Sequence, residues 1–439
     1  MPRDDLKEIP GSYGLPLIGK ILQSLAVLRD WRTFYTRRRA RYGSDVFKAA
    51  AGIESITVVD QKGIEALFDT GKFLKLYGFG ALKPPPARVG HIVPTVFTND
   101  DEHGGQKQFL LDLQRRRAPT MFATFDDVAA PYFERWRAAG AFDWGVELNA
   151  LMSDFLFEWF LGARPDPADV EGWGLQLLPR GVLRLPGQGD APVVARLERL
   201  LQVISSAPKF EEVAAMAAET AGLDGEKTAK QLLFYLGFNA WTGLHSVVRS
   251  VIAELTLHPE WQRRTVDEIR GVLEGGPELT LARLSSMPLL DAVIKETLRL
   301  HQPAPFAFGR AREDLVLHAG SGSYRVKKGQ VVQGVIGCAH RDPAVFENPD
   351  AFDPGRFAGG AADRYLIWAN GRDVDAPGAG DHMCAGRDVV YLTFKLFFVR
   401  LLPAYRWTLT EPPRWGAKIQ PANRPATPIV CETFEPRPS

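Results

Sequence analysis

Residues 381–389, with the sequence DHMCAGRDV, place Cys384 directly before a strongly apolar stretch. That stretch predicts a helix from Gly386 to Leu402, which Pro403 ends. A thiolate at the start of a helix is stabilised by unpaired N–H groups and by the positive end of the helix dipole. Taken alone, the segment also suits a buried structural cysteine, which is the more common role of an unpaired cysteine.

Two further patterns change the interpretation of Cys384. Glu296 and Arg299 form an E-x-x-R pair on a predicted helix, where residues at this spacing are neighbours. Residues 352–357 (FDPGRF) form an F-x-P-x-R-F pattern that contains Arg356. Each pattern alone is weak. Their order, with C-x-G after them and before an apolar helix, resembles the cytochrome P-450 (P450) superfamily over nearly the whole chain.

The resemblance implies a P450 fold, mainly α-helical with a small β region, in which residues 1–439 form a single heme-thiolate domain. It implies that Cys384 is the axial ligand of heme b. It also implies a buried network of Glu296, Arg299 and Arg356 that locks the segment leading to the thiolate. Such a network is tolerated only when every charge is fully paired.

The periodicity of the remaining chain agrees with a mainly helical protein. Residues 224–257 form the longest predicted helix, and residues 286–300 form another, with Ser286 as its expected cap. Leu315 to Gln333 alternates apolar and polar residues around glycines, which predicts hairpin strands.

The middle of the longest predicted helix carries a more specific pattern. Residues 236–243 (LGFNAWTG) resemble the F-N-x-W-G-G segment of plant allene oxide synthases and hydroperoxide lyases. Residues 305–311 (PFAFGRA) and 384–389 (CAGRDV) resemble two further segments of the same group. These P450s rearrange fatty-acid hydroperoxides. The glycines at 237 and 243 indicate either tight packing, a local distortion or the close approach of a flat group.

The polar residues of this helix favour the same chemistry. An oxygen-activating P450 usually needs an acid and an alcohol here, whereas Asn239 cannot titrate and has no Asp or Glu beside it. A hydroperoxide brings its own O–O bond, which ferric heme and the Cys384 thiolate can cleave without dioxygen or a reductase. Asn239 and Cys384 are therefore the predicted catalytic residues. Asn239 also suits a helix-interior amide bonded to a backbone carbonyl, and Thr242 leaves room for oxygenase chemistry.

The resemblance also implies residues that contact the cofactor and the substrate. His103 and Lys107 lie one helical turn apart and, with His382, are predicted partners of the heme propionates, unless they are solvated surface charges. Aromatic residues and one threonine form the predicted pocket wall or else ordinary core: Phe238, Trp241, Thr242, Phe306 and Phe308.

Composition narrows the class of protein. Lys and Arg number 53 against 52 for Asp and Glu, so the whole chain has no general attraction to nucleic acid or to anionic membrane. Cys338, Cys384 and Cys431 are too few and too scattered for a disulfide framework, which favours a reducing compartment. The charged N-terminus and the absence of a long apolar run predict a soluble, cytoplasmic protein without a transmembrane segment.

These observations lead to a heme-thiolate enzyme that rearranges polyunsaturated fatty-acid hydroperoxides. The product (allene oxide, cleavage aldehydes or epoxyalcohol) stays open, because Gly78 occupies the position that selects it in the plant enzymes, with Phe79 adjacent. One alternative is a reductase-dependent monooxygenase that uses Thr242. Others are a fatty-acid peroxygenase driven by hydrogen peroxide, and a non-catalytic heme sensor whose partner surface is the loop at residues 372–380. Chain length, 9- versus 13-hydroperoxide preference and oligomeric state are not decided by the sequence.

Overall fold

A computed structural model describes residues 6–16, 18–78, 83–177, 189–274, 276, 278–416 and 425–438. The α-helices are α1 Ile18–Tyr42, α2 Gln61–Glu65, α3 Asp100–Arg117, α4 Met121–Ala139, α5 Trp144–Leu161, α6 Pro167–Gly174, α8 Ala191–Ser205, α9 Phe210–Ala221, α10 Gly225–Phe234, α11 Trp241–Leu257, α12 Pro259–Leu273, α13 Leu281–Ser285, α14 Pro288–His301, α15 Ile336–Ala339 and α16 Arg387–Leu401. Short 3-10 helices span Ala66–Phe68, Pro86–Val89, Thr95–Phe97, Ala118–Thr120, Pro354–Phe357 and Asp363–Tyr365.

The strands form three sheets among these residues. They are β1 Leu6–Lys7, β2 Val46–Ala51, β3 Ile53–Val58, β4 Phe73–Leu74, β5 Phe142–Asp143, β6 Phe306–Ala311, β7 Leu315–Ala319, β8 Gly322–Val326, β9 Val331–Val335, β10 Tyr405–Leu409 and β11 Val430–Pro436. The largest sheet has the order β2-β3-β9-β6-β4, and the smaller sheets have the orders β1-β8-β7 and β10-β11-β5. The prediction of a mainly α-helical fold with a small β region is confirmed.

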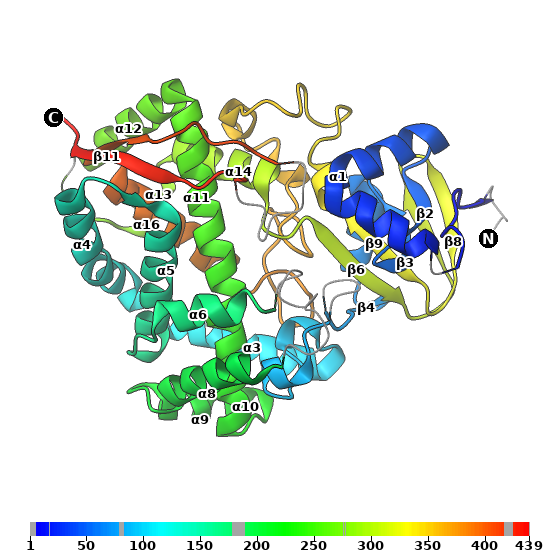
Figure 1. The fold of residues 1–439 in the computed structure, drawn as a ribbon, viewed down its shortest axis with the longest axis horizontal. Helices are drawn as coiled ribbons and strands as arrows, with labels where there is room; N and C mark the ends of the chain where they lie inside the picture. Colours follow the sequence, from blue (N-terminus) through cyan, green and yellow to red (C-terminus); the bar gives the residue numbers. More distant parts are fainter. Residues whose placement is uncertain are drawn as a thin grey trace.

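The helices and the largest sheet occupy different parts of the molecule. Most helices gather on one side, with α11 running through their middle, while α1 and the five-stranded sheet lie together on the other side (Figure 1). One hydrophobic core fills the helical part, and separate clusters lie between the sheet and its neighbours. Within the described ranges, no helix combines the length and the apolar character that crossing a bilayer requires.

The helix predicted at residues 224–257 is present with a distortion in its middle. Asp224 caps α10 by accepting a hydrogen bond from the backbone N–H of Lys227. A π-helical turn, Tyr235–Ala240, then connects α10 to α11 without a break in the helical path. Such turns widen the helix locally and are often found at functional sites.

The helix predicted at residues 286–300 is α14, but Ser286 does not cap it. Ser286 ends α13 and donates its hydroxyl to the carbonyl of Arg283. The backbone N–H groups of Leu289 and Leu290 instead donate to the carboxylate of Glu268 on α12, each at 2.8 Å. A carboxylate from a neighbouring helix therefore does what the local serine was expected to do.

The predicted hairpin at residues 315–333 forms only in part. β7 and β8 are an antiparallel hairpin with a tight turn between Ala319 and Gly322. β9 leaves this pair and enters the largest sheet, parallel to β3 and antiparallel to β6.

Candidate functional site

Cys384 lies half-buried, just before the first turn of α16. Burial is the largest influence on its thiol and raises its pKa. A hydrogen bond from Trp368, another from the backbone N–H of Gly386, and the positive charges of Lys107 and Arg387 act in the opposite direction. The surroundings of Cys384 therefore already contain groups that stabilise a thiolate.

The segment that holds Trp368 is fixed against Cys384 and α16. A β-bridge joins Ala369 to Met383, and a side chain at Gly371 would collide with Met383 at 2.7 Å. The Trp368 ring packs on Tyr391 of α16, with 4.9 Å between ring centroids. The backbone next to Trp368 and one contact of its ring are therefore fixed.

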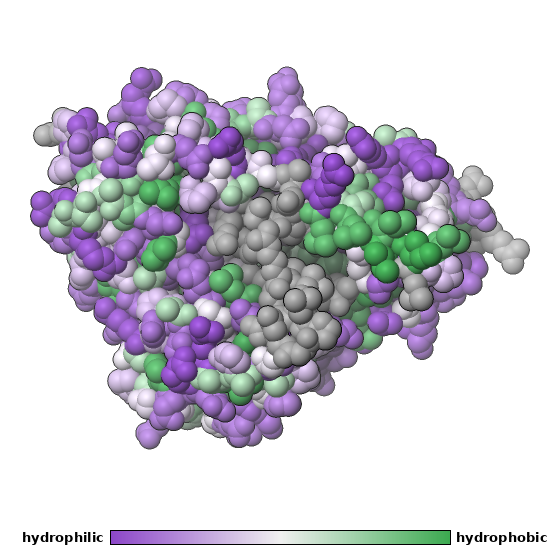
Figure 2. Space-filling model, in the orientation of Figure 1, coloured by the Kyte–Doolittle hydropathy of each residue, from purple (hydrophilic) through white to green (hydrophobic). Residues whose placement is uncertain are grey.

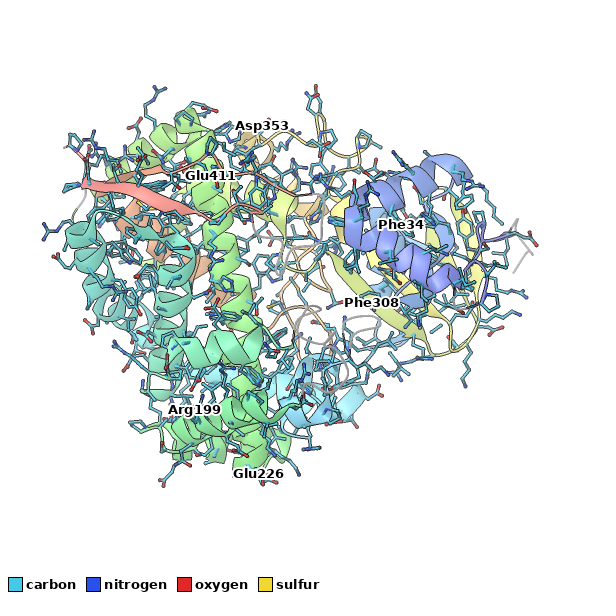
Figure 3. The ribbon with its side chains drawn as sticks, in the orientation of Figure 1. Phe34, Arg199, Glu226, Phe308, Asp353 and Glu411 are labelled. Atoms are coloured by element: carbon cyan, nitrogen blue, oxygen red, sulfur yellow. The ribbon has the colours of Figure 1, made fainter. Side chains whose placement is uncertain are left out.

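Glu296, Arg299 and Arg356 are in direct contact. Two nitrogens of Arg299 each lie 2.7 Å from a carboxylate oxygen of Glu296, and both side chains are fully buried. Arg356 Nε lies 3.3 Å from Glu296 Oε1. The same oxygen accepts the backbone N–H of Asp353 at 2.9 Å; Figure 3 marks Asp353 in the loop beside α14. The carboxylate thus has enough partners for its burial to be tolerated.

A second set of contacts connects this charge network to Cys384, and the sequence patterns did not single it out. Arg299 also donates to the carbonyl of His340 at 2.7 Å. Burial, with the charges of Arg299 and Arg341, lowers the pKa of His340 to about 3, so its ring is neutral. Its Nε2 accepts the backbone N–H of Ile367 at 2.9 Å, and Ile367 directly precedes Trp368.

Two of the residues predicted to bind the propionates, His103 and Lys107, meet at Asp381. His103 and Lys107 come from one face of α3, and both are buried. His103 Nε2 and Lys107 Nζ contact the carbonyl of Asp381 at 2.8 and 2.7 Å, and Lys107 also pairs with the carboxylate of Asp381. The ring of His382 stacks against His103, with 3.9 Å between centroids. Burial, followed by the positive charges around it, holds the pKa of His382 well below its ordinary value.

Lys75 lies close to these residues, although no sequence pattern indicated it. Its ammonium group donates to the side chain of Asn370, whose amide donates to the carbonyl of His382 at 3.1 Å. Burial lowers the pKa of Lys75 to about 7, and no carboxylate of the described residues pairs with it. A half-buried amine without a carboxylate partner is suited to an anionic ligand.

The central helix has one open face. Asn239 is exposed, and no described residue hydrogen-bonds to its side-chain amide. A side chain added at Gly243, one turn later, would meet no atom within 4 Å. Thr242 lies on the same face and donates its hydroxyl to the carbonyl of Phe238. At Gly237, by contrast, added atoms would meet Leu233 at 3.1 Å, so that glycine permits tight packing.

The predicted pocket residues do not all lie on this face. Phe238 and Trp241 are buried in the helical core, where the Trp241 ring packs on His245, 4.5 Å away between centroids. Phe306 and Phe308 are half-buried and project from the same side of β6; Figure 3 marks Phe308 on that strand.

The product-selecting segment is described only in part. Gly78 has a φ of 92°, which favours glycine. Phe79 lies outside the described residues.

The cytochrome P450 family model matches residues 231–421. A solved structure, retinoic-acid-bound cyanobacterial CYP120A1, superposes with a TM-score of 0.74 and 21% identity, covering 99% of this chain and 100% of that chain. The fold is therefore that of a cytochrome P450, and heme is its cofactor.

The curated relatives place the chain near one group of these proteins. It is 28% identical to the chloroplastic allene oxide synthase of Linum usitatissimum, over 91% of this chain and 82% of the relative. It is 29% identical to the divinyl ether synthase CYP74M3 of Selaginella moellendorffii, over 91% of each chain. It is also 29% identical to allene oxide synthase 2 of Oryza sativa subsp. japonica, over 91% of this chain and 92% of that protein.

The residues of the site fit heme. Cys384 lies half-buried beside groups that stabilise a thiolate, as an iron ligand requires, and the half-buried Lys75 has no carboxylate partner among the described residues and could pair with a propionate. The helix face that carries Asn239 and Gly243 is open, so it leaves space in which a flat group could lie. Cys384 would hold the iron, and Lys75 with His382 would be the nearest candidates for the propionates.

Proposed function

We propose that this protein converts polyunsaturated fatty-acid hydroperoxides, using heme held by Cys384, without dioxygen or a reductase. The observation that carries the proposal is the open face of the central helix. Its polar group is the amide of Asn239, and no Asp or Glu lies among residues 235–246. The similarity to allene oxide and divinyl ether synthases supports the same reading.

Heme bound through Cys384 would supply homolytic cleavage of the hydroperoxide O–O bond. The part of Asn239 is to hold the substrate at the cofactor. Its amide is exposed and unbonded by the described residues, so it is able to donate to one oxygen and accept from another. An amide does not change its charge across the working pH range, so it positions the peroxide without delivering a proton.

Thr242 is the residue that a rival oxygenase would use. Its hydroxyl proton is directed to the Phe238 carbonyl, four residues earlier. A residue that relays protons needs both a proton source and a free acceptor, and the sequence around Thr242 supplies no acid. Thr242 is nevertheless on the open face, so the reductase-dependent monooxygenase stays the second candidate.

The test mixes the heme-loaded protein with a fatty-acid hydroperoxide, with no reductase and no NADPH present. Loss of the conjugated-diene absorbance is expected, and mass spectrometry of the products then identifies allene-oxide-derived ketols, aldehydes or epoxyalcohols. Absence of consumption by fully heme-loaded protein rejects the proposal. Hydroxylated product formed only with reductase and NADPH supports the monooxygenase instead, and product formed only with added hydrogen peroxide supports a peroxygenase. Heme binding without turnover under any of these three conditions would support the non-catalytic sensor.

Two variants separate the residues of the open face. Asn239→Ala should lower kcat by about 10- to 100-fold while heme content stays the same, because one positioning hydrogen-bonding group is lost. Thr242→Val keeps the shape of the side chain and removes its hydroxyl, so hydroperoxide consumption should change by less than about threefold. A larger loss of activity in Thr242→Val than in Asn239→Ala would favour the monooxygenase.

A further inference from the structure

The two halves of α1 expose different kinds of side chain. The first half carries an aliphatic row, part of the apolar patch that Figure 2 shows over this helix: Ile18, Ile21, Leu22, Leu25 and Leu28. The helix kinks at Asp30, where φ is −157°. Beyond the kink, Arg32, Thr36 and Arg39 follow one another by about one turn, so they share one side of the helix. The second half of α1 therefore presents a row of polar and cationic side chains.

This row lines a cavity of about 230 Å³. The other residues that line it follow β3 and β9 in the chain: Val59, Gly337, Cys338, Arg341 and Pro343. Three of the eight lining residues are arginines, and none of these eight is acidic. A cavity of this size has room for several water molecules, so it is also large enough for a phosphate group.

Arg341 is the most enclosed of the three arginines. Its side chain is 13% exposed, against 36% for Arg32 and 32% for Arg39. Its Nε contacts the carboxylate of Asp350 at 3.0 Å, but the Asp350 side chain is itself 76% exposed. Burial, followed by the positive charge of Arg32, lowers the pKa of Arg341 to about 10. The surroundings of this guanidinium therefore supply too little negative charge to compensate its burial.

Several guanidinium nitrogens at this cavity have no acceptor among the residues that the structure describes. They include Nη1 and Nη2 of Arg341, Nη2 of Arg32 and Nη1 of Arg39. Arg39 uses its other nitrogens for Asp45 and Asp342, at 2.7 and 2.8 Å. Arg32 and Arg341 share a single oxygen of Asp350, at 3.4 and 3.0 Å. A pair with so exposed a carboxylate stabilises little, so donors of all three arginines are left for a ligand.

We infer that this arginine cavity, bounded by Arg32, Arg39 and Arg341, binds a phosphate group, either as inorganic phosphate or as part of a small phosphate ester. The planar fork of a guanidinium matches two oxygens of a phosphate. A tetrahedral anion has enough oxygens for three arginines, whereas a carboxylate has two. Val59 and Pro343 provide apolar walls against which the organic part of an ester can lie.

The arginine cavity is separate from the candidate heme site, but its residues are next to ones that pack against that site. Trp31, which precedes Arg32, packs on Phe306 with 5.5 Å between ring centroids. His340, which precedes Arg341, accepts the backbone N–H of Ile367 at 2.9 Å. A phosphate shared by Arg32 and Arg341 would connect these two segments and should raise the unfolding temperature. The binding itself does not depend on the reaction that the heme site performs.

The test titrates the full-length, heme-loaded protein with inorganic phosphate at neutral pH and constant ionic strength, and measures the heat of binding by calorimetry. A Kd of about 1 mM or lower is expected. Acetate should bind at least about tenfold more weakly, because it offers two oxygens in one plane. Glycerol 3-phosphate separates the two sources of the phosphate group. Tighter binding than that of inorganic phosphate indicates an ester, and equal or weaker binding indicates the free anion.

Three variants locate the contact. Arg341→Gln removes the enclosed guanidinium and should raise the Kd for phosphate by at least about tenfold, and Arg32→Gln by about threefold to tenfold. Asp350→Asn removes the carboxylate that competes for Arg32 and Arg341, so it should lower the Kd by about threefold. A gain in affinity cannot result from a damaged fold.

The matched control is Arg137→Gln on α4, which breaks an exposed pair with Glu134 and should bind phosphate like the parent. Soret absorbance and the unfolding temperature check that every variant is folded and retains heme. If Arg341→Gln does not fold, Arg32→Gln and Asp350→Asn still decide the question, because their side chains are more exposed.

Three outcomes overturn the inference. Phosphate gives no heat of binding up to about 10 mM, or acetate binds as tightly as phosphate does. Alternatively, Arg32→Gln and Asp350→Asn both bind phosphate with the Kd of the parent. Because the readout is the heat of phosphate binding, a failed hydroperoxide assay would leave this result unchanged.

Discussion

The ammonium group of Lys107 on α3 binds both the backbone carbonyl and the carboxylate of Asp381, which lies 274 residues further along the chain. Asp381 precedes Cys384 by three residues and accepts the backbone N–H of Met383 at 2.8 Å. The side chain of Lys107 is only 3% exposed. This contact therefore ties the loop of the candidate iron ligand to a helix from another part of the molecule.

Replacing Lys107 by Met should loosen that loop. The loss of two charge-assisted hydrogen bonds should lower the free energy of unfolding by about 1.5–3 kcal/mol and the ratio of bound heme to protein with it. Denaturant unfolding and the Soret absorbance measure these two quantities. Lys227→Met, which breaks an exposed pair with Asp224, should change neither, and an unaltered heme ratio in Lys107→Met would contradict the expectation.

Replacing Glu296 by Gln should be more damaging. It leaves Arg299 buried with its charge poorly compensated, and such a loss costs about 3–5 kcal/mol of unfolding free energy. The appropriate comparison is Glu435→Gln, which breaks an exposed pair with Arg406 and should cost less than about 1 kcal/mol. Equal unfolding midpoints for the two variants would show that the buried pair does not stabilise the fold.

Replacing Lys75 by Met should stabilise the heme-free protein but weaken the binding of heme. In the heme-free protein its amine is half-buried without a carboxylate, so Lys75→Met should raise the free energy of unfolding by roughly 1–3 kcal/mol. In the heme-loaded protein the same variant should release heme faster, because a propionate would lose its partner. Heme transfer to apomyoglobin measures the release rate. A variant that destabilises both forms equally would assign Lys75 a packing role only.

Removing the indole N–H of Trp368 should change the electronic state of the iron. Hydrogen bonds to the sulfur withdraw electron density from it, so Trp368→Phe should shift the heme reduction potential to more negative values by about 20–60 mV. Spectroelectrochemical titration measures the shift. Trp407→Phe removes an indole that donates to Thr256 at 2.9 Å, well outside the site, and should leave the potential unchanged.

Acid should destabilise the protein through the buried pair of His301 and Glu254. Burial lowers the pKa of His301 to about 4, although its bond to Glu254 opposes the shift. For Glu254, burial acts to raise the pKa, but bonds with His258 and His301 prevail and lower it to about 2. Both groups bind protons more readily in the unfolded chain, so their stabilisation is complete above pH 6.5 and falls as pH decreases.

The loss should be greatest between pH 6.5 and 4, with a slope of at most about 1.4 kcal/mol per pH unit for each proton. The bond to Glu254 raises the pKa of His258. The stabilisation that His258 contributes therefore acts in the opposite direction and is lost only as pH rises. His301→Gln should flatten the acid limb of the unfolding profile. His318→Gln, an exposed histidine of β7, should not. Identical acid limbs for both variants would exclude His301 as the source.

Much of the fold and part of the candidate site could be predicted because their signals are local. The E-x-x-R spacing places Glu296 and Arg299 on one side of a helix in any surroundings, and Pro259, which lacks a backbone N–H, separates α11 from α12. The apolar run after Cys384 similarly predicted α16. Ser286 was predicted wrongly as a cap because Glu268, from another helix, supplies the acceptor, and no local pattern reveals that.

The sequence by itself determined that a cysteine precedes an apolar helix, that a charge network can form, and that an amide replaces an acid in the central helix. Only the tertiary structure decided which groups surround them. Trp368, His340 and Lys75 reach the site through contacts between segments far apart in the chain, and burial, which sets their protonation, is a property of the packed molecule.

Tertiary packing also decides which face of α1 is exposed. Over the whole chain Lys and Arg number 53 against 52 for Asp and Glu, and the net charge is +1. The structure places seven basic residues in one helix and turns its aliphatic row towards solvent. Residue spacing defines the two faces of a helix, but only docking against β2 decides which face is left exposed.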